Sequence, residues 1–372
     1  MFLKWNCDIK LYFGGKNMQT KSRLSKCLVV GIILLFILTA ITPTNGQKIE
    51  KQSPPDSRGN ILYVGGSGPG NYTKIQDAIN NASNGDTVFV YDDSAPYNET
   101  VTVTKSIYLC GENRTSTIIK GEVNLNANDT TISYFTIDNH LMHYQFSGPV
   151  LHNMTISHNM VQWFFYFEAI KDLTISSNTF DMGTDVRFCS RVNITGNTIS
   201  DEEGCYLLGS NNCTISHNNL TNANVGVYLE GECQHMTIVG NTFSHCGDLI
   251  LSWGTSYMDI RRNNFINNRK KDFGIDLTMN RWVQVVENNF INSTVSCSWA
   301  WWGFHVVWDR NYWGHPRLLP KPIYNRLRFF LRYLLVYIIN RGPWEPQYPY
   351  IVLVPFSLKY DWHPAQQPYD IP

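Results

Sequence analysis

"CTISHNNL", residues 213–220, decides the fold, because the chain keeps returning to this phrase. An apolar residue is followed two positions later by Ile, and three positions after that by Asn. The phrase occurs again as "MTISHNM" (154–160), "LTISSNTF" (173–180), "VNITGNTI" (192–199) and "MTIVGNTF" (236–243). Such recurrence indicates a structural repeat before it indicates a chemical site.

The asparagine of the phrase sets the period of the repeat. The slot is filled by Asn159, Asn178, Asn197, Asn218, Asn241, Asn263, Asn288 and Asn311. Phe135 takes the same slot one repeat earlier, so the 176 residues from Phe135 to Asn311 make eight steps, a mean of 22 residues. That period is typical of a solenoid. Because β-branched residues alternate with polar ones and no LxxLxL run occurs, the sequence predicts stacked strands rather than a leucine-rich horseshoe.

A second short strand recurs between the asparagines. It reads "FYFE" (165–168), "DVRFC" (185–189), "GCYLL" (204–208), "GVYLE" (226–230), "DLILS" (248–252), "GIDLT" (274–278) and "GFHVV" (303–307). Alternation predicts apolar inward pairs at Phe165/Phe167, Val186/Phe188, Cys205/Leu207, Val227/Leu229, Leu249/Leu251, Ile275/Leu277 and Phe304/Val306. Like residues would stack about 4.8 Å apart along parallel sheets. The fold class is therefore all-β, a single-stranded parallel β-helix.

The recurrent Asn is predicted to turn the corner between two strands. Asn tolerates the left-handed backbone conformation that a tight corner needs. Its amide group can also bond the repeats above and below. We therefore interpret these eight asparagines as structural.

Both ends of an open solenoid need covering. Residues 72–83 predict a short N-terminal helix with a capping box at Thr73 and Gln76. Residues 325–340, basic and mostly apolar, predict a helix that either covers the last repeat or faces a membrane or partner. The tryptophans of 298–313 are expected under this C-terminal cap or on a sugar-binding surface. The predicted organisation is upstream residues with a signal or anchor (1–46), a linker (47–60), the β-helix (61–313) and a C-terminal cap (314–372).

The N-terminal region predicts export. An apolar run at 27–42 follows Lys21, Arg23 and Lys26, the order of a secretory signal, which is either cleaved or retained as a membrane anchor. We therefore expect an extracellular or cell-surface protein, with Asn-x-Ser/Thr sequences open to glycosylation. Formal net charge is +0, which argues against a nucleic-acid partner.

Seven cysteines follow the apolar run, and none forms a CxxC motif. We expect mostly free, buried thiols. The alternation places Cys205 and Cys213 inward. It places Cys189, Cys233 and Cys246 outward or in turns.

With these motifs in place, the chain resembles the right-handed parallel β-helix proteins of the pectate-lyase type. It is most similar to NosD-type β-helix repeat proteins exported by archaea and some bacteria. The resemblance rests on "GGSGPGNYTKIQDAINNASNGDTVFVY" (65–91), "KSIYLCGENRTSTIIKG" (105–121), the "ISxN" repeats, and the tail segments "NYWGHPRLLPKPI" and "DWHPAQQPYDI". It covers roughly residues 60–313 and the closing tail. It implies a right-handed solenoid and a ligand on the outer face of the strand that follows the corner.

The outward residues of that strand form a candidate glycan-binding stripe. They are Tyr166, Glu168, Asp185, Arg187, Tyr206, Tyr228, Glu230, Asp248, Asp276 and His305. Tyrosine rings stack on sugars and carboxylates bind hydroxyl groups, so the predicted partner is a polysaccharide or surface glycan. An ordinary solvated sheet face is the alternative.

Catalysis is a second hypothesis. Glu230, Asp248 and Asp276 fall on successive repeats, where a hydrolase would need two carboxylates about 5–9.5 Å apart. A lyase would need Ca²⁺ held by acids and a basic proton acceptor, for which Arg187 is the one central basic residue. No motif of the known polysaccharide-cleaving families lies at these positions. We expect binding or a structural role without catalysis, and no cofactor unless the protein is a lyase.

A copper-related role is the third hypothesis, since NosD-type relatives are associated with copper-site maturation. "HLMH" supplies His140 and His143 in an expected loop, and His152 follows one repeat later. No Met-rich or Cys-His string accompanies them. Surface loop histidines are the simpler interpretation.

Overall fold

The computed structural model describes residues 59–144, 149–200, 203–268, 274–278, 280–293, 295–298, 305–325 and 359–371. The chain divides into two compact units, 1–50 and 51–372, and every described residue belongs to the second. The predicted signal or anchor, residues 326–340 of the predicted helix, and Trp299, Trp301 and Trp302 lie outside the described residues. Within the described ranges, no helix is long and apolar enough to span a membrane.

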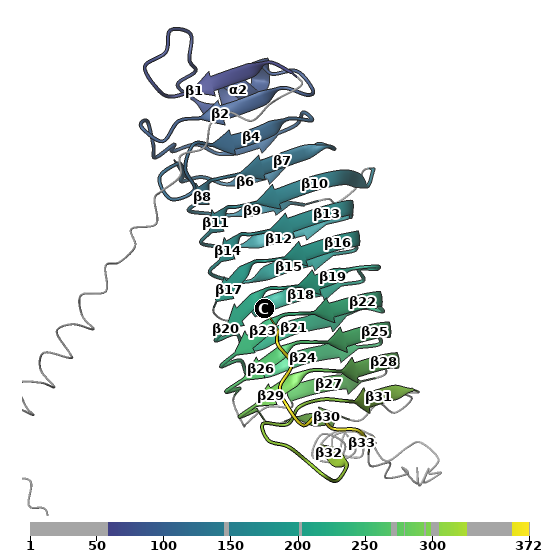
Figure 1. Ribbon diagram of the computed structural model, residues 1–372. Coiled ribbons are helices and arrows are strands. Elements are labelled where there is room, and N and C mark those ends of the chain that lie inside the picture. The colour runs from purple at the N-terminus through teal and green to yellow at the C-terminus, as the bar shows by residue number, and fades with distance from the viewer. Residues whose placement is uncertain are drawn as a thin grey trace, which may run out of the picture. The chain divides into compact units, whose positions relative to one another are not determined.

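The second unit is a right-handed parallel β-helix, as predicted, with three strands in each full rung (Figure 1). Sheet A contains β1 (Ile61–Val64), β2 (Thr87–Val90), β4 (Tyr108–Gly111), β7 (Thr130–Ser133), β10 (Leu151–Ser157), β13 (Ile170–Ser176), β16 (Ser190–Thr195), β19 (Thr214–Ser216), β22 (Gln234–Val239), β25 (Ser256–Arg261), β28 (Arg281–Val286) and β31 (Val306–Asp309). Sheet B contains β5 (Ile118–Ile119), β8 (Thr136–Ile137), β11 (Met160–Val161), β14 (Thr179–Phe180), β17 (Thr198–Ser200), β20 (Asn219–Thr221), β23 (Thr242–Ser244), β26 (Asn264–Ile266) and β29 (Asn289–Ile291). Sheet C contains β3 (Val101–Val103), β6 (Val123–Leu125), β9 (Leu141–His143), β12 (Phe165–Glu168), β15 (Thr184–Arg187), β18 (Glu203–Leu208), β21 (Val225–Glu230), β24 (Asp248–Trp253), β27 (Gly274–Thr278) and β30 (Ser296–Ser298).

The core is a set of vertical columns of like side chains. The Ile of the repeated phrase stacks on the next Ile from β10 through β25, and all of these residues are buried. In sheet B the rings of Phe243, Phe265 and Phe290 stack with centroids 4.9 Å apart at each step. The apolar side chain of each rung is buried against like side chains in the rungs above and below. This stacking explains both the repeat in the sequence and the register of the strands.

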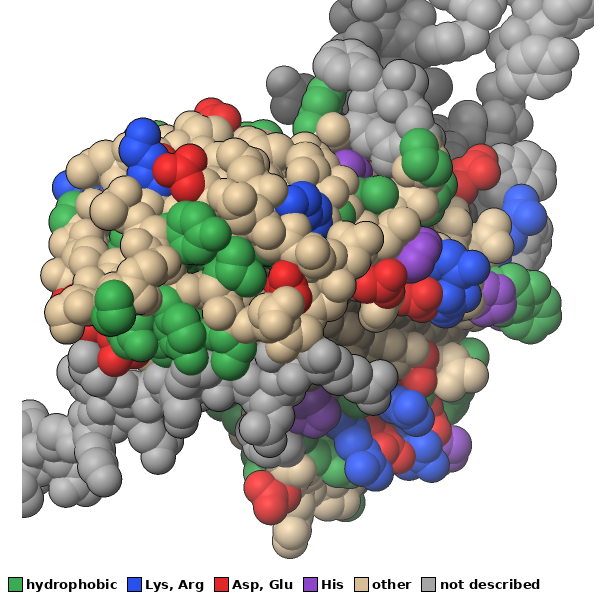
Figure 2. Space-filling model, turned by 90° about the horizontal axis from the view of Figure 1, so that it is seen from above, with side chains coloured by type: hydrophobic (Ala, Val, Ile, Leu, Met, Phe, Trp, Pro, Cys, Tyr) green, Lys and Arg blue, Asp and Glu red, His purple; other side chains and the backbone are tan. Residues whose placement is uncertain are grey.

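The N-terminal end is covered by α2 (Ile75–Asn81), but its cap differs from the prediction. The first backbone N–H groups of the helix, at Ile75 and Gln76, donate to the Glu99 carboxylate at 2.9 and 3.0 Å. The side chain of Gln76 instead pairs with the backbone of Thr102. The predicted capping box at Thr73 and Gln76 is therefore wrong, because a carboxylate from a distant loop takes its place. In the view from the N-terminal end, acidic and basic side chains lie close together and do not form separate patches of one charge (Figure 2).

The eight asparagines form a continuous internal ladder. The side-chain oxygen of each Asn accepts a hydrogen bond from the backbone N–H of the residue one rung earlier. From Asn178 onward it also accepts one from the side-chain amide of the preceding Asn, and all of these bonds are 2.8–3.2 Å long. All eight are at most 2% exposed. The left-handed backbone lies one residue earlier than predicted, at positions such as His158, Ser177 and His217. The hydrogen bonds of the side-chain amide, and not a left-handed backbone conformation, therefore explain why Asn occupies this position.

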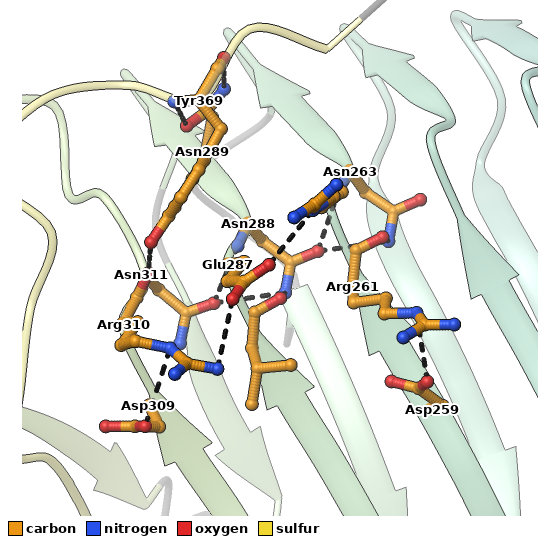
Figure 3. A network of polar contacts seen from close by, with 12 residues as sticks. Asp259, Arg261, Asn263, Glu287, Asn288, Asn289, Asp309, Arg310, Asn311 and Tyr369 are labelled. Atoms are coloured by element: carbon orange, nitrogen blue, oxygen red, sulfur yellow. Dashed lines mark hydrogen bonds and ion pairs between the residues drawn. The ribbon is translucent and has the colours of Figure 1, made fainter.

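The ladder ends on an acid at the C-terminal side. Asp361, in β33 (Lys359–Asp361), accepts at Oδ2 from the backbone and side chain of Asn311 and from Trp313 Nε1 at 2.9–3.0 Å. The chain then runs back outside sheet B, where Asn289 and Tyr369 exchange two hydrogen bonds of 2.8 Å (Figure 3). β33 also pairs with β31 and with β32 (Lys321–Asn325), so the described cap is made of strands.

The prediction slips by one residue in β24. Val227 pairs with Ile250 and Leu229 with Ser252, so Ile250 and Ser252 point inward, and both are 0% exposed. Leu251 was predicted inward and instead faces outward. Leu249 is buried, as predicted. It and Ile250 are two consecutive buried residues near the start of this strand. A one-residue shift moves every later side chain to the other face.

Three further corrections concern single positions. Phe188 is 57% exposed and lies in the left-handed region (φ 52°), so it is a corner residue and not an inward one. The predicted strand 303–307 overlaps β31, which pairs with β28 of sheet A and therefore belongs to a different sheet. Of the two positions predicted for Cys189, Cys233 and Cys246, outward or in turns, the outward one is wrong. All three lie between strands and are at most 1% exposed, and they are free thiols, so the prediction of free, buried thiols is confirmed for them.

Candidate functional site

The outer face of sheet C carries a column of polar and aromatic side chains across β12, β15, β18 and β21. In register, Tyr166 pairs with Asp185, Asp185 with Tyr206, and Tyr206 with Tyr228. We call these four residues the tyrosine column. Because the strands pair in parallel, residues 62 positions apart in sequence lie along one line on the surface.

Arg187 joins the column into one rigid unit. Its Nε and one terminal nitrogen donate to the two carboxylate oxygens of Asp185 at 2.8 and 2.7 Å. Its guanidinium carbon lies 5.2 Å from the ring centre of Tyr166 and 5.3 Å from that of Tyr206, so the cation sits between two rings. The Asp185 carboxylate raises the pKa of Arg187 further above its already high usual value. Arg187 therefore remains a cation and cannot serve as a proton acceptor.

Two glutamates hold the tyrosine hydroxyl groups. Tyr166 Oη donates to Glu168 Oε2 at 2.9 Å, and Tyr206 Oη donates to Glu230 Oε2 at 2.8 Å. Burial and the acceptor carboxylate together raise the pKa of both phenols. Both phenols stay protonated at neutral pH. The ring of Tyr206 is partly exposed, whereas Tyr166 is only 8% exposed.

The surface is hollowed beside this column. A depression of about 460 Å³ is lined by residues of β15, β18 and β21 and by Asn224. The strand residues include Asp185, Arg187, Glu203, Tyr206 and Tyr228. The rings of Tyr206 and Tyr228 lie 5.1 Å apart at 49°, so their faces are not fully covered by each other. The structure therefore brings seven of the predicted stripe residues together: Tyr166, Glu168, Asp185, Arg187, Tyr206, Tyr228 and Glu230.

The remaining acids do not form the predicted ladder. Asp276 continues the tyrosine column two rungs beyond Tyr228, through Leu251. Asp248 pairs with Val225, three residues before Leu251, and so lies off the column. At 3.3 Å per residue and 4.8 Å per rung, the backbones of Asp248 and Asp276 are about 11 Å apart, and those of Asp248 and Glu230 about 17 Å apart. Neither pair has the adjacent placement that the hydrolase hypothesis assumed.

Trp253 is a site residue that the sequence reasoning missed. The register of β24 places Trp253 beside Glu230 on the outer face, and it is 45% exposed. Correct alternation from Ile250 would have identified it. The signal was present in the sequence, but the apolar Leu249 and Leu251 favoured the wrong register.

His305 belongs to a different surface. Its ring stacks on Trp282 at 4.0 Å, Trp282 stacks on Tyr257 at 6.5 Å, and Tyr257 stacks on His235 at 4.9 Å, all within 11° of parallel. These four residues adopt the left-handed conformation at one bulge of sheet A, rung after rung. We call them the aromatic ladder. It lies on sheet A and contributes nothing to the sheet C stripe.

The three candidate metal-binding histidines do not converge. His143 lies in β9 rather than a loop, is 5% exposed and contacts Asn126 Oδ1 at 2.9 Å. His140 lies 3.8 Å from Glu122, and His152, on sheet A, lies 3.8 Å from Asp129. Among the residues that the structure describes, no group of three or more His, Cys, Asp or Glu side chains could hold a metal ion.

A comparison with protein families agrees with the fold. The family of right-handed β-helix regions matches residues 167–311. Among solved structures, the A-module of mannuronan C-5 epimerase AlgE4 from Azotobacter vinelandii is 12% identical (60% of this chain, 83% of that chain, TM-score 0.37). Pectin methylesterase PemA from Erwinia chrysanthemi is also 12% identical (80% and 100%, TM-score 0.33), as is the Dettilon tailspike protein (64% and 56%, TM-score 0.38). No curated protein matches.

Proposed function

We propose that this chain is an exported β-helix protein that binds an extended polysaccharide along the outer face of sheet C and holds it without cleaving it. The observation that carries the proposal is the tyrosine column fixed by Arg187 beside a depression. Aromatic rings offer large contact area at low cost in side-chain entropy. Their fixed positions along the solenoid axis suit a ligand that is itself a linear repeat. Export is inferred from the apolar run at 27–42 that follows a basic segment.

The geometry gives less support to the alternatives. A lyase would need a proton acceptor, and Arg187 is held as a cation by Asp185. A hydrolase would need two neighbouring carboxylates, and Asp248 is displaced from both Glu230 and Asp276. A copper-related role would need converging ligands, and His140, His143 and His152 each have a separate partner. No described feature favours any of these three over binding.

The test is binding of the purified full-length chain to a panel of neutral, amino and acidic polysaccharides by affinity electrophoresis and calorimetry. Tyr228→Ala and Trp253→Ala each remove one outward ring and leave the Arg187 contacts in place. Each should weaken binding about tenfold, the size expected for a central aromatic contact. Tyr257→Ala, which removes an exposed ring of the aromatic ladder on sheet A, should leave affinity unchanged. Equal losses in all three variants, or no binding by the wild type, would refute the proposal.

A further inference from the structure

Most hydrogen-bond donors of the stripe are already paired with acids of the protein. Arg187 donates from two of its nitrogens to Asp185, and the hydroxyl groups of Tyr166 and Tyr206 donate to glutamates. The Arg187 side chain is 35% exposed, so its other N–H groups are the donors that remain on this face. What remains toward a ligand is mainly carboxylate oxygen, which only accepts hydrogen bonds when ionised.

The net charge of the site is negative, which also favours a ligand that donates hydrogen bonds. Strands β12, β15, β18 and β21 carry four carboxylates, Glu168, Asp185, Glu203 and Glu230, and one cation, Arg187. Of these, Glu203, Asp185 and Arg187 line the depression. Because Asp185 neutralises Arg187 at contact distance, the net charge of −3 comes from the three glutamates.

From these observations, and resting on the proposed function, we infer that the ligand is a polymer of amino sugars with protonated amines. Ammonium groups supply positive charge and hydrogen-bond donors to a face on which carboxylates outnumber cations four to one. A polyuronate would bring carboxylates to a surface of carboxylates, where like charges repel. Neutral sugars can donate through hydroxyl groups but gain nothing from the charge.

The structure also names the residue that sets this specificity. Glu230 accepts from the Tyr206 hydroxyl group at 2.8 Å and also interacts with the hydroxyl group of Tyr228. It lies between the tyrosine column and Trp253, at the centre of the ring surface. Glu230→Gln keeps an acceptor for the Tyr206 hydroxyl group and removes only the charge.

The experiment uses three oligosaccharides of one length with the full chain: a glucosamine oligomer, its N-acetylated form and a galacturonate oligomer. At mildly acidic pH and low salt, the glucosamine oligomer should bind about tenfold more tightly than the N-acetylated form, and the galacturonate oligomer should not bind. The preference should shrink as salt is added. Glu230→Gln should reduce glucosamine affinity about fivefold and leave N-acetyl affinity unchanged. Asp77→Asn, which removes one exposed charge from α2, is the matched control and should change neither.

The outcomes separate the two proposals. Equal binding of the charged and acetylated oligomers, with no effect of Glu230→Gln, overturns the amino-sugar inference and leaves polysaccharide binding intact. Tightest binding of the galacturonate oligomer does the same. Failure of all three to bind, and of the wider panel, overturns both. A circular dichroism spectrum matching wild type shows whether Glu230→Gln is folded.

Discussion

Removing one rung of the asparagine ladder should cost more stability than its single side chain suggests. Asn218 is 2% exposed and accepts from the backbone and the amide of Asn197, both at 2.9 Å, while its own amide donates to Ile194 O and Asn241 Oδ1 at 2.8 and 3.0 Å. In Asn218→Ala the backbone N–H of Asn197 loses its acceptor in a site that water cannot reach. An orphaned buried donor costs about 1–3 kcal/mol, and each lost net hydrogen bond about 0.5–1.5 kcal/mol.

We therefore expect Asn218→Ala to lower the free energy of unfolding by about 3 kcal/mol. The assay is urea unfolding followed by far-ultraviolet circular dichroism and by tryptophan fluorescence, whose coincidence checks that one transition is being measured. The matched control is Asn219→Ala, the adjacent residue, which is exposed and whose side chain makes a long contact of 3.4 Å with Thr221. That control should change stability by less than about 0.5 kcal/mol. If both variants unfold at the same urea concentration, the ladder does not stabilise the stack as argued.

Three more predictions follow from the caps and the buried groups. Glu99→Ala should lower the melting temperature, because the backbone N–H groups of Ile75 and Gln76 lose their acceptor at a cost of about 1–2 kcal/mol. Thr73→Ala should leave the melting temperature unchanged. A larger loss in Thr73→Ala than in Glu99→Ala would instead support a capping box at Thr73. Burial raises the pKa of Tyr97 to about 12, so the stability it contributes is complete below pH 10 and is lost as pH rises toward 12. Tyr97→Phe should flatten that alkaline loss in unfolding curves taken from pH 9 to 12, and an unchanged slope would contradict the assignment. Burial also raises the pKa of the Cys189 and Cys205 thiols to about 12, so both should resist alkylation at pH 8 until the chain unfolds; peptide mapping of labelled native protein would reveal an exposed thiol.

The fold could be predicted from the sequence because each rung repeats one physical requirement. A buried Ile must meet another Ile, and a buried amide must meet another amide, so the period of the chain records the period in space. The caps could not be predicted in the same way. Glu99 reaches α2 from 23 residues away and Asp361 reaches Asn311 from 50, and neither contact repeats. Asp361 ends the ladder as an acid because that position needs an acceptor and no donor.

The residues of the candidate site could be predicted only in those strands of sheet C whose register could be predicted. From β12 to β21 the predicted register of the strands is correct, apart from Phe188 after β15, and the structure places Tyr166, Tyr206 and Tyr228 in one column. In β24 four apolar residues out of six leave two registers open, and a preference for Leu over Ser at inward positions selects the wrong one. That choice hid Trp253 and made Asp248 look like a neighbour of Glu230.

The contacts that give the stripe its character follow from side-chain geometry, which no sequence pattern records. Tyrosines, acids and one arginine on a sheet face could have presented a free cation to an acidic sugar. Instead Arg187 lies between two rings and is bound by Asp185, so the same composition presents rings and acceptors. Since these side chains are already held by one another, little side-chain entropy remains to be lost when a ligand arrives. Selectivity at this face therefore depends on which donors the protein keeps for itself, and that is why Glu230, more than Arg187, is the residue to change.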